Sequence, residues 1–203
     1  WKAMGELLRQ KPFMCYVGVQ GFTMGGFFGY VAASPFVLQG MYGISPQGYS
    51  VIFGCNALSV MFVALATARL SRRFGEARLL QIGNTLRCAA CLGVLAVTVL
   101  APASPLPLLV GLFFMIALQG MTLPTSFTLG ISAQNVGAGT ASGILGVAVF
   151  IFGACTSPLV GLAGGDTAVP LGLVSACTGL AAAVLGQVGN SEMQKRALRE
   201  KQA

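Results

Sequence analysis

The side chains of this chain that could take part in chemistry are few, and nearly all of them are uncharged. Arg87 is the one unambiguous charge within a long apolar stretch, and a charge at membrane depth is costly enough to mark a candidate for gating or coupling. The same side chain could instead reach the aqueous boundary or make a structural hydrogen bond. Eight polar and aromatic residues in the apolar stretches could line a substrate cavity: Gln20, Thr23, Phe27, Tyr30, Asn56, Gln119, Thr122 and Ser126.

In such a cavity, amide and hydroxyl groups orient a ligand while aromatic rings hold its apolar part. Each of the eight residues could also be an ordinary contact between two helices. Asn56 and Gln119 are the best cavity candidates, because a buried amide must find hydrogen-bond partners. Partly apolar molecules, uncharged or cationic, would suit a cavity of this kind.

Enzyme and metal chemistry find little support in the sequence. Cys88 and Cys91 form a Cys-x-x-Cys pair, but two alanines separate them, no second pair follows and the chain has no His. All six cysteines fall in apolar stretches, so no disulfide framework is predicted. Without His or a carboxylate inside an apolar stretch, neither a Ser–His pair, a His-ligated metal nor an aspartyl dyad is available. We therefore expect no enzyme activity, no metal and no cofactor.

The composition places these residues in a membrane. The 203 residues are 55% hydrophobic and 8% charged, whereas a soluble domain carries roughly a quarter charged residues. One crossing needs ~20 apolar helical residues. We expect an all-α integral membrane protein with six transmembrane helices at about residues 13–38, 49–68, 79–101, 106–131, 140–163 and 168–188. An N-terminal cytoplasmic segment, a six-helix bundle and a basic cytoplasmic tail would then occupy residues 1–12, 13–188 and 189–203.

Charged residues, prolines and glycines between and within these helices predict loops, turns, a kink and close packing. The charged residues 69–78 are expected to form a loop in water, and the prolines after residue 101 and Gly164 to Asp166 are expected to turn the chain. Pro124 predicts a kink in the fourth helix. Glycines spaced by four residues predict close helix packing, in the first helix and at both ends of the fifth: Gly21, Gly25, Gly29, Gly139, Gly143, Gly161 and Gly165.

Basic residues indicate the orientation, because cytoplasmic loops are enriched in Lys and Arg. The N-terminal segment holds three of them, the segment after the second helix four and the tail four, while the three remaining loops hold none. Both ends of the chain are therefore expected in the cytoplasm. The net charge of +7 is explained as a topology signal rather than as a nucleic-acid-binding surface.

Three segments resemble a known transporter family. Residues 68–78 resemble the loop between the second and third helices of a major facilitator superfamily half. Arg73 and Gly75 match the Arg and the second Gly of that loop. Ala68 and Arg72 stand where the loop has its first Gly and its Asp. Residues 30–45 and 138–143 resemble the C-terminal six helices of the Bcr/CflA drug-resistance branch. The resemblance covers nearly the whole chain in the expected order.

The resemblance implies a twelve-helix, proton-coupled multidrug efflux transporter of a bacterial inner membrane, of which this chain is the C-terminal half. Its partners would be the lipid bilayer, a small-molecule drug, protons and a missing N-terminal six-helix half. Arg73 and Gly75 join Arg87 as gating or coupling candidates. The chain opens with Trp1 rather than Met, which also leads us to expect a fragment of a longer protein.

Carboxylates are missing where a proton relay would need them. No Asp or Glu lies within a predicted span, and Asp166 falls at the end of the fifth helix. The titrating group would then belong to the other half. Two alternatives remain open: a major facilitator transporter of a metabolite such as a sugar or amino acid, and a structural or partner-binding membrane subunit. A charged metabolite would need a counter-charge that only Arg87 could supply.

Overall fold

The computed structural model describes residues 2–100, 103–135, 137–161 and 167–202, and the side chains of residues 4 to 199 within these ranges. The described residues form helices and short connections, with no strand among them. In chain order the elements are α1 (Lys2–Leu8), α2 (Lys11–Pro35), the π-helical η1 (Phe36–Met41), α3 (Pro46–Phe74), α4 (Glu76–Leu100), α5 (Leu106–Ala117), α6 (Gln119–Ser132), α7 (Ala138–Gly161) and α8 (Val169–Gln202).

Six helical units in the described part of the chain are long and apolar enough to cross a membrane. They are Lys11–Met41, Pro46–Phe74, Glu76–Leu100, Leu106–Ser132, Ala138–Gly161 and Val169–Arg199. The first unit joins α2 to η1, and the fourth joins α5 to α6. The predicted all-α membrane fold with six spans is confirmed.

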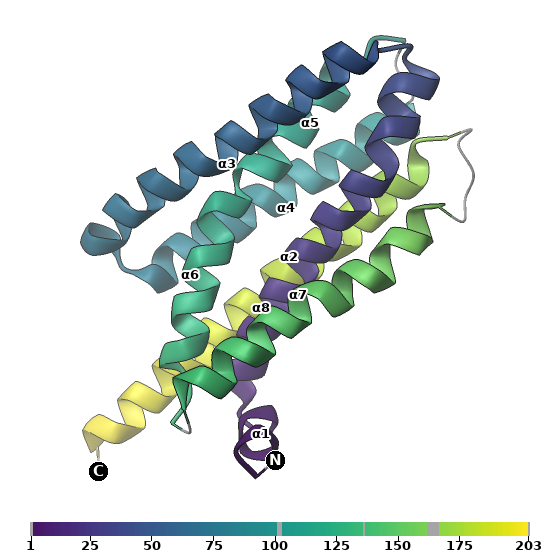
Figure 1. Ribbon diagram of the computed structural model, residues 1–203. Helices are drawn as coiled ribbons and strands as arrows, with labels where there is room; N and C mark the ends of the chain where they lie inside the picture. The colour runs from purple at the N-terminus through teal and green to yellow at the C-terminus, as the bar shows by residue number, and fades with distance from the viewer. Residues whose placement is uncertain (1, 101–102, 136, 162–166, 203) are drawn as a thin grey trace.

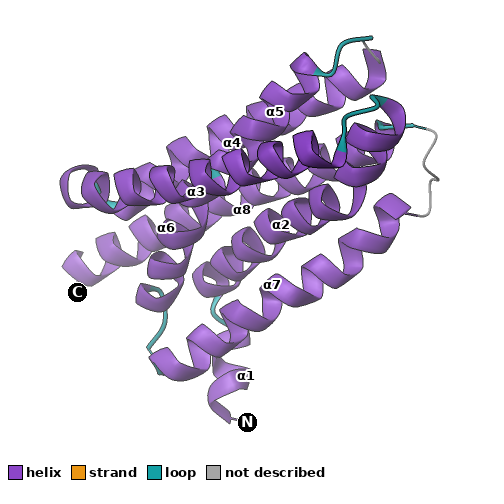
Figure 2. Cartoon of the chain, turned by 45° about the horizontal axis from the view of Figure 1, so that its top comes forward, coloured by secondary structure: helices purple, strands orange, loops and turns teal. Residues whose placement is uncertain are grey.

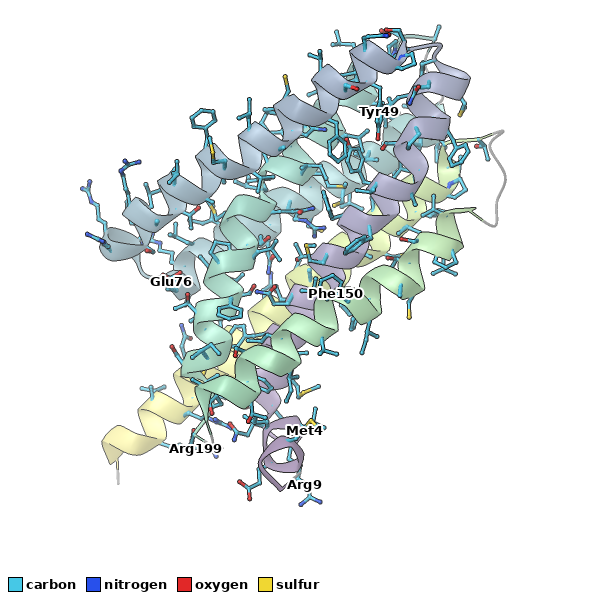
Figure 3. All side chains as sticks on the ribbon, in the orientation of Figure 1. Met4, Arg9, Tyr49, Glu76, Phe150 and Arg199 are labelled. Carbon is cyan, nitrogen blue, oxygen red and sulfur yellow. The ribbon has the colours of Figure 1, made fainter. Side chains whose placement is uncertain are left out.

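The helices run up and down through one bundle. Figure 1 shows both chain termini at one end, together with the turn between α3 and α4, the end of α6 and the start of α7. The ends of α2, α4 and α7 lie at the opposite end. Arg9 and Arg199 project at the end that holds the termini (Figure 3). An even number of crossings returns the chain to the side from which it started.

The charged segment between α3 and α4 is helical on both sides of a single residue, so the expected loop at residues 69–78 was wrong. Arg72 and Arg73 occupy the last turn of α3, and Glu76 occupies the first turn of α4. Each charge has the sign that stabilises its helix end. Gly75 alone makes the turn, with φ at 79°, which L side chains rarely adopt.

Other helix ends also extend beyond the apolar stretches. α3 begins at Pro46, because the Ser45 hydroxyl accepts a hydrogen bond from the Gly48 N–H at 3.1 Å and caps the helix. The basic stretch from residue 189, expected to be a tail, continues α8 as a helix to Gln202. The turn expected after residue 101 is confirmed where it is described, since residues 103–105 form bends before α5 begins at Leu106. The turn expected at residues 164–166 falls outside the described residues.

The fourth span changes direction one turn and a half before its proline. α5 ends at Ala117 and α6 begins at Gln119, while Pro124 lies inside α6. Proline has no N–H to bond the carbonyl four residues earlier, and its ring crowds that carbonyl. At the break, the Leu118 carbonyl accepts from both Met121 and Thr122 at 3.1 Å. Figure 1 shows α6 running at an angle to α5.

α2 lies inside the bundle, flanked by α7 and α8 (Figure 2). Its small residues permit this close approach, because Gly21 leaves room for the Phe152 ring and Gly25 for Thr156. The packing expected at Gly139, Gly143 and Gly161 was wrong, since a methyl group at any of them would meet no described atom within 4 Å, and Gly165 lies outside the described residues. α7 begins at Ala138, two residues before the predicted start of the fifth helix.

Candidate functional site

A cavity of about 310 Å³ opens between α2, α3, α5 and α6. Its volume is at the lower end of the range found for small-molecule sites, ~300–1,000 Å³. Aromatic and aliphatic side chains predominate among its lining residues, which are Met24, Phe27, Tyr30, Phe53, Asn56, Ala57, Val60, Ile116, Gln119 and Leu123. The cavity therefore combines an apolar wall with a small number of polar groups.

Four of the eight sequence candidates line this cavity: Phe27, Tyr30, Asn56 and Gln119. They come from three different spans, so that tertiary structure rather than sequence proximity brings them together. The other four, Gln20, Thr23, Thr122 and Ser126, are buried and do not line it. They lie instead in contacts between helices: Gln20 and Ser126 between α2 and α6, and Thr122 against Gly83 of α4.

Gln20 shows how such a contact is made. Its Nε2 donates to the Leu123 carbonyl oxygen at 2.7 Å and to the Ser126 Oγ at 3.0 Å, which ties α2 to α6. Ser126 in turn donates to the Thr122 carbonyl oxygen at 2.6 Å within its own helix. Both side chains are thus used for packing, because their polar atoms must be paired in the apolar interior.

The polar end of the cavity is built by Tyr30 and Asn56. The Asn56 Nδ2 donates to the Tyr30 Oη at 3.0 Å, which joins α3 to α2. The Tyr30 ring lies parallel to the Phe53 ring, with 6.2 Å between centroids and 10° between planes. Phe27 lies one turn earlier, its ring centroid 6.3 Å from that of Tyr30. These rings offer flat apolar faces beside a hydrogen-bonded amide.

Gln119 faces this arrangement from the first residue of α6. Its side chain is 3% exposed, and its Nε2 has no hydrogen-bond partner among the described residues. The next residue, Gly120, packs directly against the backbone of α3 at Val60 and Ala64, where no Cβ would fit. That close approach sets the position of Gln119 relative to α3.

Arg87 lies inside the bundle and does not reach the aqueous boundary, since its side chain is 1% exposed. Its Nη2 donates to the Thr23 backbone carbonyl oxygen at 3.1 Å, while its Nε finds no hydrogen-bond partner in the described part of the chain. No salt bridge to Arg87 is found within the described residues. The guanidinium is therefore a buried charge held by the backbone of α2, outside the residues that line the cavity.

Arg73 and Gly75 lie at one end of the bundle, away from the residues that line the cavity. Arg73 is exposed, and its guanidinium carbon lies 5.5 Å from the centroid of the Phe74 ring. Gly75 makes the turn into α4 and accepts its positive φ without strain. Their position suits a contact at the membrane surface, and neither touches the cavity.

Sequence reasoning missed several residues that the structure brings into use. Phe53 and Met24 line the cavity, and only the rotation of their helices reveals this. Asn84 lies one turn before Arg87 and donates to the Ala182 carbonyl oxygen at 3.1 Å. An amide within an apolar stretch was a signal that could have identified Asn84, as it did Asn56. Among the described residues, no three of His, Cys, Asp and Glu come together to hold a metal.

No protein-family model matches the chain. The "uncharacterized MFS-type transporter YdgK" of Bacillus subtilis is 37% identical over 188 residues, which are 92% of this chain and 45% of that protein. The chain is similar to a transporter of the major facilitator superfamily. The "bicyclomycin resistance protein homolog" of Haemophilus influenzae is 24% identical over 165 residues, 81% of this chain and 41% of that protein.

Both relatives come from bacteria, and the first is named as an MFS-type transporter. Neither relative carries the name of an enzyme. The chain spans less than half the length of the curated relatives it matches. Six apolar helices are consistent with one half of a major facilitator fold.

Proposed function

We propose that this chain is the C-terminal six-helix half of a Bcr/CflA-type transporter, which exports partly apolar drugs in exchange for protons by alternating access. The similarity to an MFS-type transporter supports the transport mechanism, and the relative named for bicyclomycin resistance supports a drug as substrate. The share of each relative that the chain spans, 45% and 41%, supports a further six-helix half.

The observation that carries the proposal is the cavity lined by Tyr30, Asn56 and Gln119. Gln119 lies at the middle of the span Leu106–Ser132, so the cavity opens at membrane depth. Substrate sites of transporters built from two repeats lie near the midplane, between the halves. Aromatic and aliphatic walls with two amides suit a molecule that is largely apolar and carries some hydrogen-bonding groups.

Proton coupling would depend on a titrating group outside this chain. Within the described residues of the six spans, the acidic side chains are Glu76, at the start of α4, and Glu192, in the C-terminal part of α8, and neither lines the cavity. Asp166 falls outside the described residues. A proton relay needs a carboxylate or comparable group within the membrane. We therefore assign proton binding to the N-terminal half.

The same proposal places both ends of this segment in the cytoplasm and the bundle in a bacterial inner membrane. The end of the bundle that holds the termini also carries the basic side chains Arg72, Arg73 and Arg199. Cytoplasmic ends of membrane helices are enriched in Lys and Arg. Arg73 and Gly75 would then act in gating at the cytoplasmic surface, and Arg87 would act inside the bundle.

An accumulation assay tests this function. Bacteria that express the full-length gene are expected to accumulate less of an uncharged aromatic drug, such as chloramphenicol, than cells with an empty vector, and a protonophore should abolish the difference. Asn56→Leu removes the amide that bonds Tyr30 and should weaken export about tenfold, the effect of one buried hydrogen bond. Gln187→Leu, at an exposed position on α8, is the matched control and should export normally.

Other results would lead to other functions. Uptake of a sugar or amino acid, without an effect on any drug, would identify a metabolite transporter. No effect on any compound, with the protein confirmed in the membrane, would favour a structural or partner-binding subunit. The isolated 203-residue chain, reconstituted in vesicles, is expected to catalyse no proton-driven transport.

A further inference from the structure

We infer that Gln119 selects the ligand of the cavity: its carboxamide N–H donates a hydrogen bond to an acceptor, such as a carbonyl oxygen, on an uncharged molecule with aromatic rings. The inference rests on the proposed function and narrows it, because it names the substrate class and the residue that recognises it. The hydrogen bonding, the charge and the shape of the cavity wall support it.

Hydrogen bonding distinguishes Gln119 from the other polar residues of the wall. Tyr30 and Asn56 are bonded to each other at 3.0 Å, so that the Asn56 Nδ2 is already paired. The Gln119 Nε2 is buried with no partner among the described residues. Burying an N–H group without a hydrogen-bond acceptor costs free energy, because its hydrogen bond to water is not replaced. A ligand carbonyl supplies the missing acceptor, and rotation about the last side-chain bond lets the amide present its N–H groups.

The charge of the wall argues for an uncharged ligand. Of the described residues that line the cavity, none is Asp, Glu, Lys or Arg. Arg87, the buried cation of the bundle, is not part of the wall. Moving a cation from water into an apolar cavity without a counter-charge is strongly unfavourable. A neutral molecule with a hydrogen-bond acceptor avoids this cost.

The shape of the cavity argues for flat rings. Phe53 and Tyr30 lie parallel on one side, and Phe27 lies beside Tyr30. Ile116 and Leu123 flank Gln119 on the side of α5 and α6. A ring system can pack against the aromatic faces while its carbonyl points toward α6. Because Gly120 packs on the backbone of α3 at Val60, the start of α6, which carries Gln119, is held beside α3 before the ligand arrives.

Photolabelling of the purified full-length protein tests the inference. Benzophenone, an uncharged diaryl ketone, is bound in the dark and cross-linked with near-ultraviolet light, and labelled peptides are identified by mass spectrometry. Labelling is expected on the cavity wall around Met24 and Phe53. Two competitors share one ring system: fluorenone carries a carbonyl where fluorene carries a methylene. We expect fluorenone to compete at about tenfold lower concentration than fluorene, the effect of one buried hydrogen bond.

Gln119→Met keeps the length of the side chain and removes the donor, so the two competitors should become equal. Gln187→Met makes the same chemical change at an exposed position of α8 and should preserve the difference. The aromatic cation N-methylacridinium should compete at least as poorly as fluorene.

Equal competition by fluorenone and fluorene in the wild-type protein would overturn the inference, even if Gln119→Met does not fold. So would labelling confined to other surfaces, stronger competition by the cation, or a difference that persists in a folded Gln119→Met protein. Binding that depends on Gln119 in a protein that exports nothing would refute the proposed transport function alone. Drug export without this dependence would refute the inference alone.

Discussion

The Nη2 of Arg87 lies 3.1 Å from the backbone carbonyl oxygen of Thr23 and donates a hydrogen bond to it. The contact joins α4 to α2 in the interior of the bundle, where Arg87 is 1% exposed. It neutralises none of the positive charge, because a carbonyl is a dipole and the described residues place no carboxylate in a salt bridge with Arg87. The bundle thus retains a charge whose burial is costly.

Replacing Arg87 distinguishes the effect of its buried charge on stability from its role in transport. Arg87→Met should stabilise the folded full-length protein by about 1–4 kcal/mol, because a buried charge without a partner is exchanged for an apolar side chain of similar length. Thermal unfolding of the purified protein measures the change. If Arg87 acts in gating or coupling, as proposed, drug export by the same variant should fall although the protein is more stable. Export at the wild-type rate would contradict that role.

The turn between α3 and α4 should require glycine at residue 75. Gly75 has φ 79° and ψ 150°, a backbone conformation that costs an L residue about 1–3 kcal/mol. Gly75→Ala should therefore lower the unfolding temperature. Gly54→Ala is the control, because Gly54 is helical and a methyl group there meets no atom within 4 Å. A stabilised Gly75→Ala protein would show that the turn can be rebuilt.

Close packing of α6 on α3 should make Gly120 sensitive to a single methyl group. Gly120→Ala pushes a Cβ against the Val60 carbonyl oxygen and should destabilise the protein by about 1–3 kcal/mol. It should also weaken binding of benzophenone at the neighbouring Gln119. Gly146→Ala, in an open part of α7, should be neutral or stabilising. Equal unfolding temperatures for the two variants would mean that the helices separate at little cost.

A buried hydrogen-bond chain should couple α2, α8 and α4 near the end of the bundle. Tyr16 Oη donates to Asn190 Oδ1 at 2.9 Å, and Asn190 Nδ2 donates to the Ala77 carbonyl oxygen at 2.9 Å. A double-mutant cycle of Tyr16→Phe and Asn190→Leu, measured as free energies of unfolding in denaturing detergent, should give a coupling of about 0.5–1.5 kcal/mol. Strictly additive effects would indicate that the two side chains do not stabilise one another.

The position of Asn190 also shows where sequence reasoning reached its limit. Apolar content predicted the sixth span to about residue 188, yet α8 continues as a helix and Asn190 is 2% exposed. The arginines near residue 72 led to the wrong prediction of a loop for the same reason. Charged residues indicate contact with water, but they do not indicate whether the backbone forms helical hydrogen bonds. The local signals for the true helix ends were the positive φ at Gly75, the side-chain cap at Ser45 and the fixed φ of Pro46.

The sequence by itself determined the six spans and the return of the chain to its starting side, because a run of ~20 apolar residues must leave water whatever its neighbours are. Only the tertiary structure decided which polar side chains share a cavity. Asn56 and Gln119 reach it, whereas Gln20 bonds α6 instead. The rotation of each helix about its axis depends on packing between helices, such as Gly120 against Val60, and no local pattern specifies that rotation.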